Sequence, residues 1–277
     1  MHDIKYIRDN FDDSYHESSA IKRDLRVPIF GELPFIDRLE EFKSGKNYYE
    51  NLNNLYKNRK FEKYKKALIN IFNFINILEK DNNISSICFS SIERNSGSST
   101  MLIFLGKLLS EIGKKVLIID ANFRKPTINI GLGLDNSLGL ENVLKDNKLN
   151  WQNYIKESPD NKNLFVISSG QNQEDHIKIF SSKTFVGLLQ DIKSSGEFDF
   201  IIIDSPNLKD SPETFSLATI ADGIALLVPL DNVSRKNVTE FISKLVTKNI
   251  RVLGIVSSKI NSRIKNEKFK NNNSIFS

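Results

Sequence analysis

Short apolar runs suited to buried strands alternate along the chain with segments whose apolar residues have helical spacing. The apolar runs cover residues 84–89, 116–119, 164–167, 198–203, 223–228 and 252–256, and helical spacing is found at 100–112, 140–144, 184–192 and 238–246. Strands that are apolar throughout and alternate with helices are typical of a parallel sheet covered by helices on both faces. The pattern therefore predicts an α/β core over residues 81–260.

The pattern is less regular outside this core. Residues 1–26 are charged with little apolar periodicity, and we expect a flexible arm there. Residues 27–80 are expected to form a short apolar strand at 27–34, a polar linker or irregular helix at 35–59 and an amphipathic helix at 61–78. The apolar side of that helix, which should pack on the core, comprises Tyr64, Leu68, Ile71, Phe72, Ile75 and Leu78. Residues 261–277 are basic and polar, and we expect a disordered tail.

The loop at residues 90–99, between the first core strand and its helix, is small and polar. Such a loop is where backbone N–H groups and the helix dipole hold a phosphate. Gly97 permits close backbone approach, and Ser98, Ser99 and Thr100 supply hydroxyls and a helix cap. The phosphate-binding sequence G-x-x-x-x-G-K-[ST] requires lysine where this chain has Ser98. The sequence therefore predicts a loop derived from a nucleotide-binding site that has lost the lysine needed for its chemistry.

Two aspartates directly follow apolar runs, Asp120 after 116–119 and Asp204 after 198–203. Ligands of parallel sheets bind beyond the carboxyl ends of the strands, which is the edge where both aspartates and the loop are expected. Carboxylates and a hydroxyl beside phosphates are what a magnesium-bound nucleotide requires. Taken singly, each aspartate is also compatible with a helix cap or a turn after a strand.

Composition excludes several other classes. The single cysteine, Cys88, rules out an internal disulfide, and His2, His16 and His176 lack the spacing of zinc ligands. No stretch approaches the ~18 apolar residues of a membrane span, and the N-terminus lacks a signal-peptide core, so we expect a soluble cytoplasmic protein. Much of the net charge of +5 comes from the tail. A solvated tail is favoured over one that binds nucleic acid or lipid, and no nucleic-acid partner is expected.

Five phrases carry a resemblance to a known family. Residues 28–34 read PIFGELP, residues 94–100 RNSGSST, residues 117–126 LIIDANFRKP and residues 199–207 DFIIIDSPN, while Asn136, Gly139, Leu140 and Leu144 fit N-x-x-G-L-x-x-x-L. Over residues 27–260 the chain resembles the cytoplasmic domain of bacterial tyrosine kinases (BY-kinases). These belong with polysaccharide co-polymerases and are related to the MinD/ParA-type P-loop ATPases, which have a deviant Walker motif. The resemblance implies a P-loop NTPase fold.

The resemblance also implies roles for matching residues. ATP or ADP would be bound by Arg94, Asn95, Ser96, Gly97, Ser98, Ser99 and Thr100. Magnesium would be held by Ser99, Asp120 and Asp204, and the catalytic positions would be Asp120, Asn122 and Asp204. Both cofactors are expected to bind weakly or not at all.

The chain departs from the family at several of these positions. Ser98 carries no positive charge that could stabilise the terminal phosphates in the transition state. Asn122 replaces a carboxylate. Glu93 is expected to repel phosphate, whereas Asn95, which replaces a glycine, tolerates a positive φ. The family's E-x-x-R-x-x-R phrase is weakened to Glu62, Lys65 and Leu68, and the tail has no tyrosine. Together these changes argue against efficient phosphoryl transfer.

The leading hypothesis is therefore a catalytically impaired regulatory or scaffold module of surface polysaccharide (capsule or exopolysaccharide) biosynthesis or export. It would be held at the inner face of the cell membrane by a membrane co-polymerase or export partner; assembly into a homo-oligomer is left open. In the first alternative, Arg94 replaces the lysine of an active tyrosine autokinase. Its candidate phosphorylation sites would be Tyr6, Tyr15, Tyr48 and Tyr49. A MinD/ParA-type positioning ATPase ranks last, because that class has a further lysine where this chain has Glu93.

Overall fold

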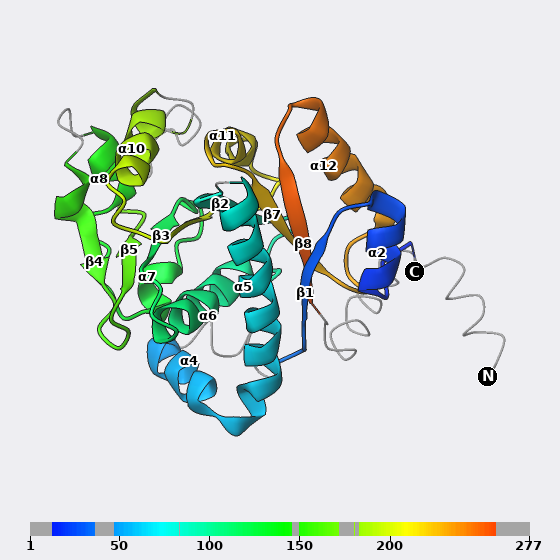
Figure 1. Cartoon of the computed structure of the whole chain (residues 1–277), viewed down its shortest axis with the longest axis horizontal. Coiled ribbons are helices and arrows are strands. Elements are labelled where there is room, and N and C mark those ends of the chain that lie inside the picture. Colours follow the sequence, from blue (N-terminus) through cyan, green and yellow to red (C-terminus); the bar gives the residue numbers. More distant parts are fainter. Residues whose placement is uncertain are drawn as a thin grey trace, which may run out of the picture.

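An eight-stranded sheet forms the centre of the protein (Figure 1). The computed structural model describes residues 13–36, 47–82, 84–145, 150–171, 180 and 183–258. The strands are β1 (Ile29–Leu33), β2 (Ser86–Ser91), β3 (Val116–Asp120), β4 (Ile155–Glu157), β5 (Leu164–Ile167), β6 (Phe200–Asp204), β7 (Ile224–Pro229) and β8 (Val252–Ser258). Their order is β1-β8-β7-β2-β6-β3-β5-β4, and the pairing is parallel except between β4 and β5. The predicted α/β class with a parallel sheet is confirmed.

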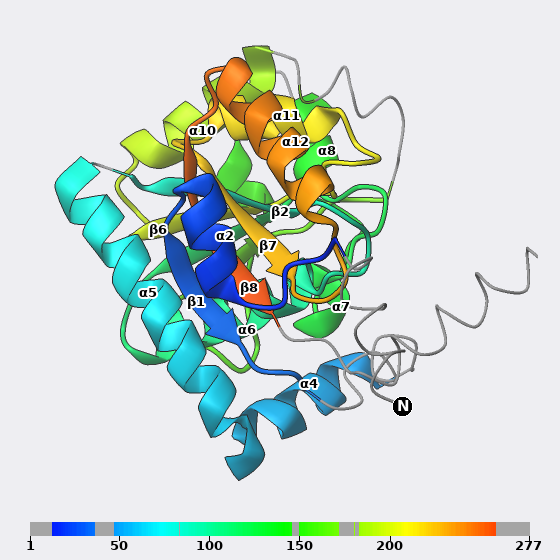
Figure 2. The same cartoon turned by 90° about the vertical axis from the view of Figure 1, so that its right-hand side faces the viewer.

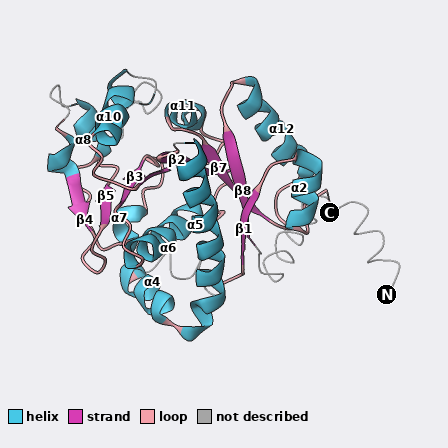
Figure 3. Cartoon of the chain, in the orientation of Figure 1, coloured by secondary structure: helices cyan, strands magenta, loops and turns pink. Residues whose placement is uncertain are grey.

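Helices cover both faces of this sheet (Figures 1 and 3). One face packs against α2 (Ser18–Leu25), α8 (Leu140–Lys145), α10 (Lys183–Ser194), α11 (Glu213–Ile220) and α12 (Arg235–Thr247). The other packs against α4 (Tyr48–Lys57), α5 (Glu62–Asn82), α6 (Ser98–Glu111) and α7 (Ile128–Gly131). Two short 3₁₀ turns, η1 (Arg59–Phe61) and η2 (Trp151–Tyr154), join neighbouring elements. Each face of the sheet therefore has its own apolar core.

Elements that the sequence pattern did not predict are short or weakly patterned. β4 is only three residues long and not buried, so it has no apolar run. α11 lies between two predicted elements, and α4 falls within the segment 35–59, where the pattern predicted only a linker or an irregular helix. The buried residues of α4 are two tyrosines and a leucine, Tyr48, Tyr56 and Leu52. Tertiary contacts stabilise these elements more than any local sequence pattern does.

Residues 13–26 differ from the expected flexible arm. They include α2, which lies beside β1 and α12 (Figure 2), and Ser14 forms an isolated antiparallel bridge with Ser234. Tyr15 and Ile21 are almost fully buried, and the Arg235 guanidinium lies 4.9 Å from the centre of the Tyr15 ring. Only Ala20 and Ile21 of α2 are buried, and two such residues are too few to produce a periodicity. The rest of the predicted arm, residues 1–12, and the predicted tail at 261–277 lie outside the described residues.

The predicted amphipathic helix is confirmed as α5. Four of the six residues of its expected apolar side are buried, and Phe72 and Leu78 pack partly buried against the same core. At the start of α5, an aromatic cluster joins it to α4 and α6. The Phe104 ring of α6 lies 4.6 Å from Phe61, 5.8 Å from Tyr64 and 6.0 Å from Tyr56, measured between ring centroids. Residues 47–82 thus complete one face of the sheet.

The N-x-x-G-L phrase is explained by packing at the end of β5. The Asn136 side chain donates to the Gly170 carbonyl and accepts from the Gly170 N–H, both at 3.0 Å. The Leu140 N–H donates to the carbonyl of Ser168 over 2.6 Å. A Cβ at Gly139 would lie 2.1 Å from that same carbonyl oxygen. Only glycine therefore lets the loop after α7 reach β5.

Replacing Gly139 by alanine is expected to destabilise the protein by about 2–3 kcal/mol, because the added methyl group meets rigid backbone. Urea unfolding of the two proteins measures the difference. The matched control is Leu138→Ala at the neighbouring, half-exposed position, where a change below about 1 kcal/mol is expected. Equal losses at both positions would contradict the steric explanation.

Candidate functional site

Three strand ends meet at one edge of the sheet. β2 pairs with β6 and β6 with β3, so the carboxyl ends of the three parallel strands lie side by side. Asp120 and Asp204 are direct register partners across the β3–β6 pair, and both side chains are fully buried. The expectation that these two aspartates converge is confirmed in position; their roles remain predictions.

The loop from β2 to α6 is held in a fixed shape by its own hydrogen bonds. The hydroxyls of Ser91 and Ser96 both donate to the Glu93 carbonyl, at 2.8 and 2.7 Å. Asn95 and Gly97 have φ angles of 58° and 91°, so the predicted tolerance of Asn95 for a positive φ is used here. The Gly97 carbonyl accepts the first bond of α6, from the Met101 N–H. The N–H groups of the first helical turn are thereby left without intrahelical partners.

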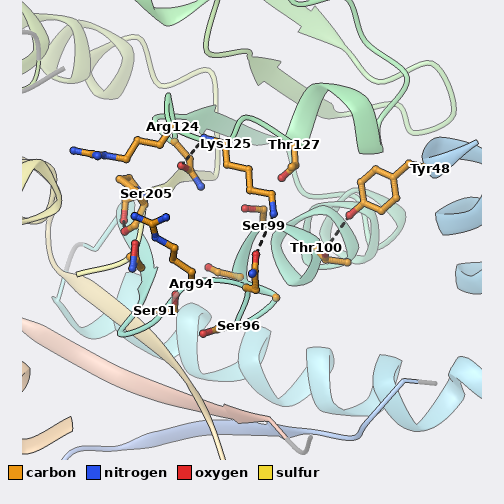
Figure 4. Close-up of a pocket in the computed structure, with 16 residues that line it drawn as sticks. Tyr48, Ser91, Arg94, Ser96, Ser99, Thr100, Arg124, Lys125, Thr127 and Ser205 are labelled. Atoms are coloured by element: carbon orange, nitrogen blue, oxygen red, sulfur yellow. Dashed lines mark hydrogen bonds between the residues drawn. The ribbon is translucent and has the colours of Figure 1, made fainter. Parts of the chain in front are cut away.

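A pocket of about 550 Å³ opens above this loop (Figure 4). Its lining includes every predicted nucleotide-binding residue: Arg94, Asn95, Ser96, Gly97, Ser98, Ser99 and Thr100, together with Asn122. Asp120 and Asp204 are buried next to the lining residues Asn122 and Ser205. The Asn122 N–H donates to one Asp120 carboxylate oxygen over 3.1 Å. The structure thus brings all of the predicted site residues together.

Several buried oxygen atoms in this site have no hydrogen-bond partner. They are both carboxylate oxygens of Asp204, one of Asp120 and the hydroxyl of Ser98. Burial raises the pKa of Asp204 to about 7, with the nearby Ser99 hydroxyl opposing the rise. Burial and the facing Asp204 carboxylate raise the pKa of Asp120 well above its ordinary value. Unpaired buried carboxylates are costly, and a cation between them would offset that cost.

The residues present fit a magnesium ion that is bound together with phosphates. Among the described residues no group of three or more His, Cys, Asp or Glu side chains is arranged around a metal position. Magnesium does not require such a cage, because it usually takes one or two carboxylates, water and substrate phosphates. Asp120, Asp204 and the Ser99 hydroxyl supply hard oxygen ligands of that kind.

Three cationic side chains line the pocket, and their partners differ. The Arg94 Nε atom lies 2.8 Å from an Asp210 carboxylate oxygen, and the Arg124 Nε atom lies 2.7 Å from a carboxylate oxygen of the buried Glu213. The Lys125 Nζ atom donates instead to the neutral amide oxygen of Asn95, over 3.0 Å. Arg94 is thus engaged by a carboxylate, which disfavours the hypothesis that it replaces the missing lysine.

Glu93 does not have the position that was expected of it. Its carboxylate lies 3.3 Å from the Lys209 Nζ atom and accepts from the Asn237 amide over 3.4 Å. Glu93 is not among the lining residues of the pocket. The expected repulsion between Glu93 and a phosphate is therefore reduced by a paired lysine, and Glu93 instead fastens the base of the loop to α12.

Residues 85–252 match a family described as the AAA domain, and this region is more than half of the chain. The chain belongs to the AAA domain family. Curated relatives of this AAA domain include a tyrosine-protein kinase of Bacillus subtilis, YwqD. It is 28% identical over 176 residues, covering 64% of this chain and 73% of the relative. The putative tyrosine-protein kinase CapB of Staphylococcus aureus is 28% identical over 65% of this chain and 77% of its own length. The resemblance to bacterial tyrosine kinases is confirmed.

A third relative is a much longer protein than this chain. The succinoglycan biosynthesis transport protein ExoP of Rhizobium meliloti is 24% identical over 62% of this chain but only 22% of its own length. Solved structures show the same fold: the BceF tyrosine kinase domain has a TM-score of 0.76 at 18% identity, covering 90% of this chain and 100% of that chain. MinD of Pyrococcus horikoshii OT3, complexed with Mg-ADP, has a TM-score of 0.51 at 20% identity, over 63% and 69% of the two chains.

Sequence reasoning missed several residues that line the pocket of this AAA domain. They are Tyr48, Arg124, Lys125, Thr127, Ser205, Pro206 and Asn207. The Tyr48 hydroxyl lies 3.0 Å from the Thr100 Oγ1 atom, and burial raises the pKa of Tyr48. No local pattern connects residue 48 with residue 100. Arg124 and Lys125, in contrast, stand within the phrase LIIDANFRKP and could have been considered.

Proposed function

We propose that this protein is a nucleotide-binding regulatory or scaffold module for the synthesis or export of a surface polysaccharide, and that its capacity for phosphoryl transfer is impaired. The observation that carries the proposal is a mismatch within one pocket. Two buried, partly unpaired carboxylates, Asp120 and Asp204, lie next to lining residues of a pocket whose loop has the neutral Ser98 at the lysine position. Among the relatives, the succinoglycan biosynthesis transport protein ExoP supports a role in polysaccharide synthesis or export, and the tyrosine-protein kinase YwqD supports a nucleotide site.

The backbone from Gly97 to Thr100 would bind the phosphates of ATP or ADP, at the N-terminus of the 14-residue helix α6. Ser99 and Asp204 would hold magnesium, which would neutralise phosphate oxygens, and Asp120 would lie beside it. Asn122 offers an amide where the family has a second carboxylate, so it cannot accept the proton of an attacking hydroxyl. Losing one positioned donor to a transition-state charge costs roughly a hundred- to a thousand-fold in rate. Ser98 and Asn122 together therefore favour slow or absent transfer.

A membrane co-polymerase or export protein is the proposed partner, at the inner face of the cell membrane. No helix in the described ranges is long and apolar enough to cross a membrane, so membrane association would come through that partner. The proposal leaves assembly into a homo-oligomer open. Leu68, at the third position of the weakened E-x-x-R-x-x-R phrase, is fully buried on the core, and Lys65 lies 4.2 Å over the Tyr56 ring. Lys65 and Leu68 therefore offer fewer polar contacts to a neighbouring copy of the chain than two free arginines would.

The alternatives have less support. An active autokinase using Arg94 would require that side chain to leave Asp210. A positioning ATPase would require a lysine at Glu93, which instead pairs with Lys209.

Calorimetric titration with magnesium-ATP tests the proposal. The parent protein is expected to bind weakly, and Ser98→Lys is expected to bind at least about tenfold more tightly, because a charge-assisted hydrogen bond contributes about 1.5–3 kcal/mol. The matched control Thr219→Lys adds the same charge at an exposed position on α11 and should bind like the parent. Micromolar binding by the parent, with phosphotyrosine forming on incubation, would remove the impaired-module proposal.

A further inference from the structure

Lys125 differs from the other two cations of the pocket in having a neutral partner. Arg94 and Arg124 each lie within 2.8 Å of a carboxylate oxygen. In the part of the chain that the structure describes, the Lys125 ammonium group donates a hydrogen bond to the Asn95 amide and forms no ion pair. An amide carries no net charge, so the positive charge of Lys125 is not neutralised at the pocket.

We propose that Lys125 supplies, from the opposite wall of the pocket, the positive charge that the phosphate loop lacks at Ser98. In a bound nucleotide it would pair with the oxygens of the terminal phosphates. This inference rests on the proposed nucleotide-binding function and assigns the cation of that same site. It makes Lys125 a binding residue for a polyphosphate, with Asn95 as the group that holds it in the absence of ligand.

The geometry supports this assignment. Lys125 belongs to the loop between β3 and α7, and its side chain extends across the pocket toward the loop that precedes α6 (Figure 4). Asn95, which receives its ammonium group, stands three residues before Ser98 and takes a left-handed conformation with φ 58°. The Ser98 hydroxyl is buried without a partner. The loop before α6 thus has a neutral group at the lysine position, and the β3–α7 loop brings the charged group of Lys125 to it.

The energetics favour transfer of Lys125 from Asn95 to a phosphate. The contact with Asn95 joins a cation to a neutral amide, whereas a phosphate oxygen adds direct attraction between opposite charges. Lysine is a compact charge on a flexible four-carbon stem, so its ammonium group can move by rotations of its own side chain. Arg94 and Arg124 would first have to leave their carboxylates, and Glu213, the partner of Arg124, is almost fully buried. Of the three cations, Lys125 is the one that can turn to a ligand at least cost.

A fluorescence titration of the full chain with magnesium and N-methylanthraniloyl-ATP tests the inference. Lys125→Gln is expected to raise the Kd at least about tenfold, the factor that one charge-assisted hydrogen bond corresponds to, while Lys125→Arg should stay within about threefold. In a Ser98→Lys background the same Lys125→Gln change should raise the Kd by less than about threefold, because the new lysine supplies the charge. Thermal stabilisation by the same ligand provides a second readout that does not depend on turnover.

Lys80→Gln is the matched control, because Lys80 is an exposed lysine near the end of α5 that does not line the pocket. Its Kd should equal that of the parent. An unchanged Kd in Lys125→Gln, or a weaker affinity in Arg94→Gln instead, would overturn the role of Lys125 and leave the proposed function standing. Binding of the probe by Ser98→Lys but not by the parent would overturn that role in the same way. Absence of binding in both would overturn the proposed function and this inference together.

Discussion

Asp204→Asn is expected to raise the stability of the ligand-free protein at pH 8 by about 1–3 kcal/mol and to abolish its stabilisation by magnesium-ATP. Burial raises the pKa of Asp204 from 3.8 to about 7. The folded state therefore holds a proton that the unfolded state has lost, and stability falls as pH rises from about 4 through 7. Asparagine keeps the shape and removes the charge, so this decline should disappear. Thermal unfolding between about pH 3.5 and 8.5, with and without magnesium-ATP, measures both effects.

The pH dependence separates this explanation from a general change in packing. Below about pH 4 the parent and Asp204→Asn should differ little, since Asp204 is then protonated in both the folded and the unfolded state. Asp191→Asn, at an exposed position of α10, is the matched control, and its curve should run parallel to that of the parent. If the parent lost no stability relative to Asp204→Asn between pH 5.5 and 8.5, burial of the ionised carboxylate would not be destabilising the folded state.

Phe104→Ala is expected to destabilise the protein by about 3–5 kcal/mol, the largest effect on folding that we expect from a single side chain. Phe104 is fully buried, and its ring contacts Tyr56, Phe61 and Tyr64. Removing it leaves a cavity at the junction of α4, α5 and α6. Urea unfolding gives the free-energy change, and limited proteolysis should show faster cleavage within residues 47–61.

Phe74→Ala is the control, because Phe74 is 37% exposed on α5 and stacks only on Phe30 among the ring contacts of the described residues. A loss below about 1.5 kcal/mol is expected there, with unchanged proteolysis at 47–61. Similar losses at the two positions would mean that the aromatic cluster does not anchor α4 and α5 to the core.

The sequence pattern predicted the six strands from β2 to β8 that carry continuous apolar runs, and it also predicted the strand at the start of the linker. It did so because the side chains of a buried strand and the apolar side of a helix such as α5 leave a local periodicity. It did not predict β4, whose three residues are not buried, or the packing of α2, which depends on two buried side chains. In the candidate site too, the residues that could be predicted are those with a local sequence pattern. Asp120 and Asp204 could be placed at the carboxyl edge of the sheet because each ends an apolar run.

The sequence by itself determined the parallel α/β fold of the P-loop NTPase type, and that the loop after the first core strand carries Ser98 instead of lysine. Both are properties of residues close together along the chain. Only the tertiary structure decided which cations face the pocket: Arg94 is engaged by Asp210, whereas Lys125 reaches Asn95 from thirty residues away. It also placed Tyr48 against Thr100. The reason is that such contacts depend on how separate segments pack on the two faces of the sheet, and the spacing of residues within one segment carries no information about them.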